Sequence, residues 1–204
     1  MWLYLAIFAV ALACANWPKL NRSRVYLACA LVFLALFVGF GDMLGGYDRY
    51  IYGAHFDGTH DFRVAGQSVT DMPIWFYGSE FGYVYLNYLL SFVTANRYIF
   101  LLIVTCLVYF NIYHSLKEYT DNFPIAIILF LSLQFFFTFT YLREVIGMSF
   151  AWFAYKQIVK RNLLLFLLFV FIAFSFHNSA IVVLPVWFIP NHKFNKHFIW
   201  LVFA

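Results

Sequence analysis

Charged side chains are scarce in this chain of 204 residues. They make up 11% of it, whereas 65% of the residues are hydrophobic and 24% are aromatic, and the mean hydropathy is +0.81. Soluble domains carry about 25% charged residues, so this chain lacks the polar residues that a water-exposed surface needs. A chain dissolved in a lipid bilayer needs polar residues mainly in its loops. The composition therefore predicts an integral membrane protein.

The sequence also lacks the motifs of several other classes. Its three cysteines, Cys14, Cys29 and Cys106, lie in apolar stretches without CxxC spacing, so we expect them to be structural. His55 and His60 do not share one helical face, and no metal site is predicted there. Walker, GxSxG and GxGxxG motifs are absent, as is a basic block long enough for nucleic acid. We predict no cofactor, although a divalent metal bound with a diphosphate is compatible with the sequence.

The apolar segments favour helices, because several of them are apolar on every face. Candidate spans are residues 1–15, 25–40, 81–95, 98–113, 123–141, 144–158, 162–176 and 179–190, with a last one opening at Phe198. We predict an all-α fold, a polytopic transmembrane helical bundle with about eight spans, in which residues 1–204 form one integral-membrane domain. Residues 1–15 lack a basic start and are interpreted as a span rather than a signal peptide. The segment from Phe198 is too short to cross, so we expect a longer architecture.

Lysine and arginine residues decide the orientation, since basic residues accumulate in short cytoplasmic loops. If every candidate span crosses, five of the thirteen basic residues lie inside. If residues 81–95 instead form a juxtamembrane or re-entrant helix, nine of the thirteen lie inside. We therefore predict a first large outer loop over residues 41–97 that contains juxtamembrane helices. The basic residues left outside are all arginines: Arg49, Arg63, Arg97 and Arg143.

This topology brings the scarce polar residues to the outer membrane face. They are Asp42, Asp48, Arg49, Glu80, Arg97, Arg143, Glu144 and His177. Acids, arginines and a histidine at one membrane surface are typical of a site that handles an anionic, lipid-anchored substrate. Arginine suits such a substrate because its guanidinium binds phosphate in a bidentate manner. A transporter would more often place these groups near the midplane.

The Gly-Tyr-Asp-Arg-Tyr motif, residues 46–50, opens the outer loop. Asp48 can act there as a general base toward a sugar hydroxyl, or bind a metal ion that carries a diphosphate. The alternative is a surface ion pair between Asp48 and either Arg49 or Arg63. Aromatic residues 75–77 of the same loop could stack on sugar faces.

Three more polar positions interrupt the apolar segments. Arg143 and Glu144 stand at a corner between two apolar segments, where Arg143 can stabilise a leaving diphosphate or the two can simply pair at the interface. His177 can be a general base or donate to a phosphate oxygen, or it can serve as a cap or packing residue at a helix break. Glu80 precedes an apolar helix, where it can act as an N-terminal charge, and Tyr83 with Asn87 could line a groove.

The order of these motifs resembles a known family. The motifs are Gly-Tyr-Asp-Arg-Tyr at 46–50, Glu80 with Gly82 and Tyr83, Leu-Arg-Glu at 142–144 followed by Ser-Phe-Ala at 149–151, the basic residues from Lys156 to Arg161, and Phe-His-Asn-Ser-Ala at 176–180. They resemble the EpsG-like branch of Wzy-type polysaccharide polymerases, whose layout is similar to type C glycosyltransferases. The chain has Gly-Tyr-Asp and Arg-Glu where family members commonly have Gly-Thr-Asp or Gly-Ala-Asp and Arg-Gln.

The resemblance implies a multi-pass enzyme of the bacterial cytoplasmic (inner) membrane. Such an enzyme joins undecaprenyl-diphosphate-linked oligosaccharide repeats into capsule, exopolysaccharide or O-antigen at the periplasmic face. Its implied partners are the lipid-linked oligosaccharide, the bilayer, a flippase and a chain-length regulator, with no nucleic acid.

Matched motif by motif, the resemblance makes Asp48, Arg143 and His177 the catalytic candidates. We predict substrate contacts from Tyr47, Arg49, Glu80, Arg97 and Glu144. Two other classes stay open. One is a transporter or flippase of the same lipid-linked glycan. The other is a membrane acyltransferase of surface sugars, which needs a carboxylate near His177, and folding would have to bring Glu80 there.

Overall fold

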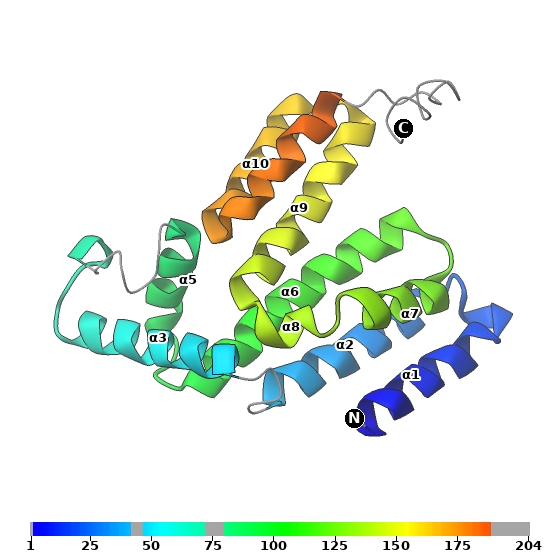
Figure 1. Ribbon diagram of the computed structural model, residues 1–204, viewed down its shortest axis with the longest axis horizontal. Helices are drawn as coiled ribbons and strands as arrows, with labels where there is room; N and C mark the ends of the chain where they lie inside the picture. The colour runs from blue at the N-terminus through cyan, green and yellow to red at the C-terminus, as the bar shows by residue number, and fades with distance from the viewer. Residues whose placement is uncertain (1, 42–46, 72–79, 189–204) are drawn as a thin grey trace, which may run out of the picture.

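A computed structural model describes residues 2–41, 47–71 and 80–188 of the chain (Figure 1). Within these ranges every regular element is helical, which confirms the all-α prediction. The α-helices are α1 (Trp2–Ala15), α2 (Arg24–Phe40), α3 (Tyr47–Val64), α5 (Phe81–Ser91), α6 (Arg97–Tyr119), α7 (Phe123–Leu133), α8 (Phe137–Thr140), α9 (Leu142–Lys160) and α10 (Leu163–Phe176). Three 3₁₀ helices are η1 (Pro18–Leu20), η2 (Val69–Asp71) and η3 (Asn178–Phe188). Asp42, residues 75–77 and the segment from Phe198 lie outside the described residues.

Polar side chains set the starts of several apolar helices. Ser23, Asn96, Asn122 and Asn162 each accept a hydrogen bond from a backbone N–H in the first turn of the helix that follows. These N-caps satisfy donors that would otherwise be left unpaired at the helix ends. Arg161 ends α9 in the left-handed conformation, with φ of 52°, and so turns the chain directly into α10.

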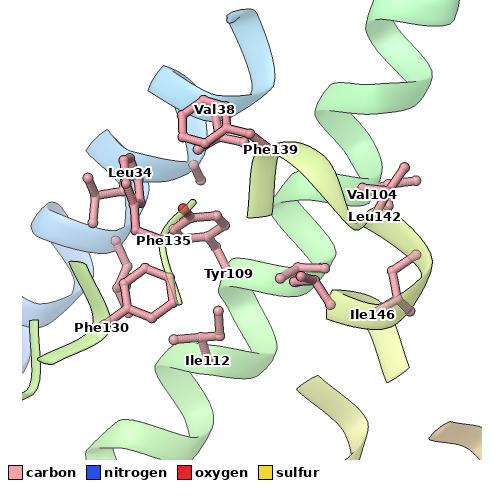
Figure 2. Packing of buried hydrophobic residues seen from close by; sticks show 14 of the residues in the cluster. Leu34, Val38, Val104, Tyr109, Ile112, Phe130, Phe135, Phe139, Leu142 and Ile146 are labelled. Carbon is pink, nitrogen blue, oxygen red and sulfur yellow. The ribbon is translucent and has the colours of Figure 1, made fainter. Parts of the chain in front are cut away.

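The predicted single span over residues 123–141 is wrong. Helix α7 ends at Leu133, and a turn over residues 134–136 separates it from the short helix α8. The turn directs Phe135 into the core, where it is 1% exposed and packs edge-on against Phe139, with ring centroids 5.1 Å apart (Figure 2). A hydropathy window does not detect this break, because the residues on both sides of it are equally apolar.

The described residues of the outer-loop region contain two α-helices and the short 3₁₀ helix η2. Helix α3 occupies the predicted outer loop and carries several charged residues, and α5 follows Glu80 with 11 residues. At 1.5 Å per residue, α5 is about 16 Å long, roughly half of the hydrocarbon thickness of a bilayer. Figure 1 shows both helices beside the start of α6 and away from α1.

The long helices pack with defined directions. At the end of α2, a Cβ on Gly39 would lie 2.5 Å from Leu102 near the start of α6, so α2 and α6 are antiparallel. Asn111 of α6 donates to Ser149 of α9. Further toward the C-terminal end of both helices, Glu118 of α6 pairs with Lys156 of α9, so α6 and α9 are parallel. Buried side chains from α2, α6, α7, α8 and α9 form the main core (Figure 2).

This arrangement gives the bundle two distinct ends. At one end, here called the lysine end, lie Lys19, Arg22, Arg24, Lys117, Lys156, Lys160 and Arg161, around the junctions α1–α2, α6–α7 and α9–α10. At the other, here called the arginine end, lie Arg49, Arg63, Arg97 and Arg143. The described basic residues are thus divided as the sequence-based orientation expects.

Among the described residues, one helix is both long and apolar enough to cross a membrane, namely α6 with 23 residues. The other apolar helices, including α1, α2, α7 and α10, are shorter than 18 residues. The prediction of about eight spans is therefore not confirmed, and multi-pass insertion stays a prediction.

Candidate functional site

The carboxylate of Glu80 joins two residues that are far from it in the sequence. Its Oε2 lies 2.7 Å from Nη1 of Arg143, and its Oε1 lies 2.6 Å from Nδ1 of His177. The Glu80 side chain is 7% exposed, whereas those of Arg143 and His177 are 30% and 32% exposed. We call these three residues the Glu80 cluster. It combines a buried acid with a cation and an imidazole that both reach the surface.

Three helix ends supply the cluster. Glu80 directly precedes α5, Arg143 lies in the first turn of α9, and His177 is the residue that ends α10. The alternative in which Arg143 pairs only with its neighbour Glu144 is not what forms. The acyltransferase alternative required a carboxylate near His177, and Glu80 meets that condition.

Two glycines allow these helix ends to approach. A Cβ on Gly82 would lie 2.8 Å from both the Cβ and the carbonyl oxygen of Ser175, and closer still to its Oγ. A Cβ on Gly147 would lie 3.0 Å from the Ala173 carbonyl oxygen and 3.4 Å from Cβ of His177. Gly82 is two residues after Glu80, and Ser175 is two residues before His177. The contact between α5 and α10 therefore places the carboxylate beside the imidazole.

Two tyrosines flank the guanidinium of Arg143. Its Cζ lies 5.9 Å from the ring centroids of both Tyr52 and Tyr83, within the range of a cation–π contact. The two rings meet edge to face, and both residues are buried. Burial raises the pKa of Tyr52, while a hydrogen bond and the charge of Arg143 act in the opposite direction. Tyr52 is thus a neutral phenol at physiological pH, and a neutral phenol can both donate and accept a hydrogen bond.

His55 lies on the same helix as Tyr52. Burial lowers the pKa of His55 from its ordinary value, and the nearby positive charge of Arg143 lowers it further. The imidazole is therefore neutral at neutral pH. Because Arg143 affects the protonation of both side chains, α3 lies within electrostatic reach of the Glu80 cluster.

Asp48 lies in the first turn of α3 and is half-buried. It is one helical turn before Tyr52, and its negative charge is among the influences that raise the pKa of Tyr52. The expected alternative, a pair with Arg63, does not form, since Arg63 instead donates to Ser91 Oγ at 2.8 Å and stacks over Phe92. Asp48 is near the Glu80 cluster rather than part of it.

Arg49 and Arg97 hold α3 in place. The Arg49 side chain is buried and donates from Nη2 to the carbonyl oxygens of Val38 and Gly39, at 2.6 and 3.1 Å, at the end of α2. The last carbonyls of a helix have few backbone partners, and here Val38 also accepts from the Gly41 N–H at 3.2 Å, so Arg49 adds a donor at this helix end. Arg97 pairs with Asp57 of α3. The predicted substrate contacts of both arginines stay predictions, and each has a structural role in addition.

The remaining predicted substrate contacts are exposed. Tyr47 stacks on Tyr50 at a centroid distance of 6.2 Å on the surface of α3, and Glu144 is exposed in the first turn of α9. Sequence reasoning missed Asp57 and Tyr52. Both lie on the same amphipathic helix as Asp48 and Arg49, at helical spacing from them. This shared helix is the signal that would have drawn attention to them.

No three His, Cys, Asp or Glu side chains of the described segments are grouped so that they could hold a metal ion. Within the Glu80 cluster, both carboxylate oxygens of Glu80 already contact other side chains, one Arg143 and the other His177. A metal bound together with a diphosphate stays a prediction.

The model of the EpsG family matches residues 24–204, which is most of the chain. The chain belongs to the EpsG family, a family of polysaccharide polymerase-like membrane proteins, and the resemblance that the motifs indicated is confirmed. Asp48, Glu80, Arg143 and His177 all fall within the matched range. No curated protein and no solved structure matches the chain.

Proposed function

We propose, from its membership in the EpsG family, that this protein extends a surface polysaccharide at the outer face of the bacterial cytoplasmic membrane. Its substrates would be oligosaccharide repeats linked to undecaprenyl diphosphate. In each cycle a glycosidic bond forms and a lipid diphosphate leaves. The observation that carries the proposal is the Glu80 cluster, because it places a cation and an imidazole together at the arginine end of the bundle.

Arg143 is suited to the leaving diphosphate. A guanidinium has five N–H donors and stays charged at any working pH, and contact with Glu80 holds this one in place. Charge develops on the diphosphate oxygens as the bond to the sugar breaks. A cation fixed in advance at that position stabilises the transition state more than the ground state.

The proton acceptor for the attacking hydroxyl that the sequence predicts is Asp48. Asp48 is half-buried one turn before Tyr52, and the charges of Asp48 and Arg143 both act on the Tyr52 phenol. Tyr47 on the exposed side of α3 would then contact the sugar chain, as aromatic rings commonly do.

The orientation of the bundle supports the proposal. The lysine end would face the cytoplasm under the positive-inside rule, and the arginine end would face the compartment in which the repeats are joined. In this orientation α3 and α5 lie near the outer leaflet. A flippase that delivers the repeats and a chain-length regulator are the expected protein partners.

A labelling experiment tests the orientation. Single cysteines at Arg63 and at Lys117, in a variant without Cys14, Cys29 and Cys106, are treated with a membrane-impermeant thiol reagent in intact cells and in inverted vesicles. We expect the Arg63 position to react only from outside and the Lys117 position only from inside. Reaction of both from one side would contradict the orientation.

An assay in liposomes tests the activity. The purified protein is supplied with lipid-linked repeats, and products are separated by length on a gel. We expect the wild-type protein to give a ladder, and Arg143→Ala to lower the rate by about 100-fold or more. Glu118→Gln changes an acid of the lysine end and is the matched control. An Arg143→Ala protein with the wild-type rate would refute the role of this residue.

The contact between His177 and Glu80 also favours a second candidate. A histidine held by a carboxylate on the outer face is what a membrane acyltransferase of surface sugars needs. The same liposomes distinguish the two functions. Transfer of a radiolabelled acyl group to the glycan, with no change in chain length, would replace the polymerase proposal, and translocation of the glycan without either change would indicate a flippase.

A further inference from the structure

The two nitrogens of the His177 ring have different surroundings. Nδ1 lies 2.6 Å from Oε1 of Glu80, which is hydrogen-bond distance to a carboxylate. A carboxylate only accepts hydrogen bonds, so the Nδ1 atom is the donor in this contact. In the neutral ring the proton is then on Nδ1, and Nε2 carries the lone pair. Glu80 therefore selects the tautomer of His177.

Glu80 itself is held from the other side. Its second oxygen contacts Arg143 at 2.7 Å, and the carboxylate is almost completely buried. A carboxylate fixed at both oxygens cannot rotate away from the imidazole. The close contact of Gly82 with Ser175 further limits the movement of the backbone next to Glu80. The imidazole is thus held in one orientation, with about a third of the side chain still exposed.

The described residues give Asp48 no comparable support. In the part of the chain that the structure describes, no hydrogen bond or ion pair orients its carboxylate. Catalytic groups need to be held within about 0.5 Å of the productive position, and that support normally comes from hydrogen bonds to other residues. His177 has such support among the described residues, and Asp48 does not.

We infer that His177 accepts the proton of the attacking hydroxyl at Nε2, and that Glu80 is the positioning residue that sets this ring between the acceptor sugar and Arg143. This inference rests on the proposed function and changes its assignment of the proton acceptor from Asp48 to His177. A carboxylate that orients a histidine base recurs on unrelated folds, where the histidine takes a proton from a hydroxyl group.

The hydroxyl oxygen of the acceptor sugar forms a bond to the anomeric carbon of the donor, and the bond from that carbon to the diphosphate oxygen breaks. The electron pair of the broken bond leaves with the lipid diphosphate, beside Arg143. The hydroxyl proton moves to Nε2 of His177, and the resulting imidazolium is stabilised by the Glu80 carboxylate on Nδ1. The proton is later released to water.

The first test removes the base. In the liposome assay we expect His177→Ala to lower kcat by about 100-fold or more, with little change in the KM for the lipid-linked repeat. Because the side chain is partly exposed, imidazole added to the buffer should enter the vacated space and raise the rate roughly tenfold. Recovery by a small base is a result that a purely structural histidine would not give.

The second test separates positioning from catalysis. Glu80→Gln should lower kcat about 10- to 100-fold, because an amide can present either a donor or an acceptor to Nδ1 and no longer selects the tautomer. Glu80→Asp should recover part of that loss. Imidazole should not rescue the double variant with His177→Ala and Glu80→Gln. Glu118→Gln, the same change in an ion pair at the lysine end, should leave the rate unchanged.

The outcomes are separable. A wild-type protein that makes no polymer would overturn the proposed function together with this inference. An active wild-type protein whose kcat survives His177→Ala but is lost in Asp48→Asn would overturn the inference alone and return the base role to Asp48. If Glu80→Gln gives no folded protein by size-exclusion chromatography in detergent, the imidazole rescue of His177→Ala and its dependence on Glu80→Asp decide the question.

Discussion

Two ion pairs, one at each end of the helical bundle, differ in burial. At the lysine end, Arg22 pairs with Asp121 at 2.7 Å, but the two side chains are 79% and 77% exposed. At the arginine end, the Glu80 carboxylate pairs with Arg143 and is almost fully buried. An exposed pair contributes about 0 to 1 kcal/mol, whereas a buried carboxylate carries a large desolvation cost that its partners must offset.

The difference indicates what each end does. The exposed pair of Arg22 and Asp121 joins two helix junctions that the N-caps already define, so little depends on it. Apolar residues of similar volume would stabilise a fold as well as a buried acid does. The presence of Glu80 therefore points to a chemical task.

Removing the cation from the buried carboxylate should have the largest effect. Arg143→Ala leaves Glu80 buried with only His177 beside it, and we expect a loss of about 3 kcal/mol in the free energy of unfolding. The apparent Tm in detergent, measured by intrinsic fluorescence, is the readout. Lys156→Ala at the lysine end is the matched control. Equal losses in the two variants would remove the distinction between the ends.

Adding a side-chain atom between α5 and α10 should have the second-largest effect. In Gly82→Ala the new Cβ would lie 2.8 Å from the Ser175 backbone oxygen, and overpacking of this kind costs about 1 to 3 kcal/mol. The displacement also separates Glu80 from His177, so polymer synthesis should fall more than stability alone explains. Gly53→Ala is the control, because its nearest neighbour is the flexible side chain of Arg97 at 3.0 Å. Equal activity of the two variants would contradict this view of Gly82.

His55 should make stability depend on pH. Burial and Arg143 lower the pKa of His55 in the folded protein. Between that lowered value and about 6.5, the unfolded state binds more protons than the folded state, so stability decreases as the pH falls below about 6.5. The apparent Tm should therefore decrease from pH 7 to pH 5, and less so in His55→Gln. Identical curves for both proteins would show that His55 does not contribute.

The smallest effect is expected at the lysine end. Arg22→Ala breaks a pair that solvent already screens, and the loss in unfolding free energy should be below about 1 kcal/mol. Raising the salt concentration should reduce the difference between this variant and the wild-type protein further. A loss as large as that of Arg143→Ala would mean that exposure is a poor guide to the importance of these pairs.

The helix positions could largely be predicted from the sequence. Predicted spans 25–40 and 162–176 correspond to α2 (Arg24–Phe40) and α10 (Leu163–Phe176), because polar caps bound these apolar segments. The failure at 123–141 has a physical reason. Phe135 turns into the core between α7 and α8, and a break that exchanges one apolar environment for another leaves no trace in hydropathy.

The site residues could be selected from the sequence but not assembled. Arg143 and His177 were identified because a charged or polar group next to hydrocarbon is costly and therefore rare. Their shared contact could not be inferred, since Glu80 and His177 are 97 residues apart and belong to helices whose crossing the sequence does not specify. The sequence indicated a helix charge or a substrate contact for Glu80 and not its partners, because the residues that contact its carboxylate lie far from it along the chain.

The amino-acid sequence alone indicates an all-helical chain of a membrane-protein family and the few polar residues that merit attention, because composition and hydropathy report which segments are compatible with lipid. The position of Glu80 between Arg143 and His177 follows from the tertiary structure. That contact depends on how closely α5 and α9 approach the end of α10. The approach is set by side-chain volume at Gly82 and Gly147, which no count of apolar residues records.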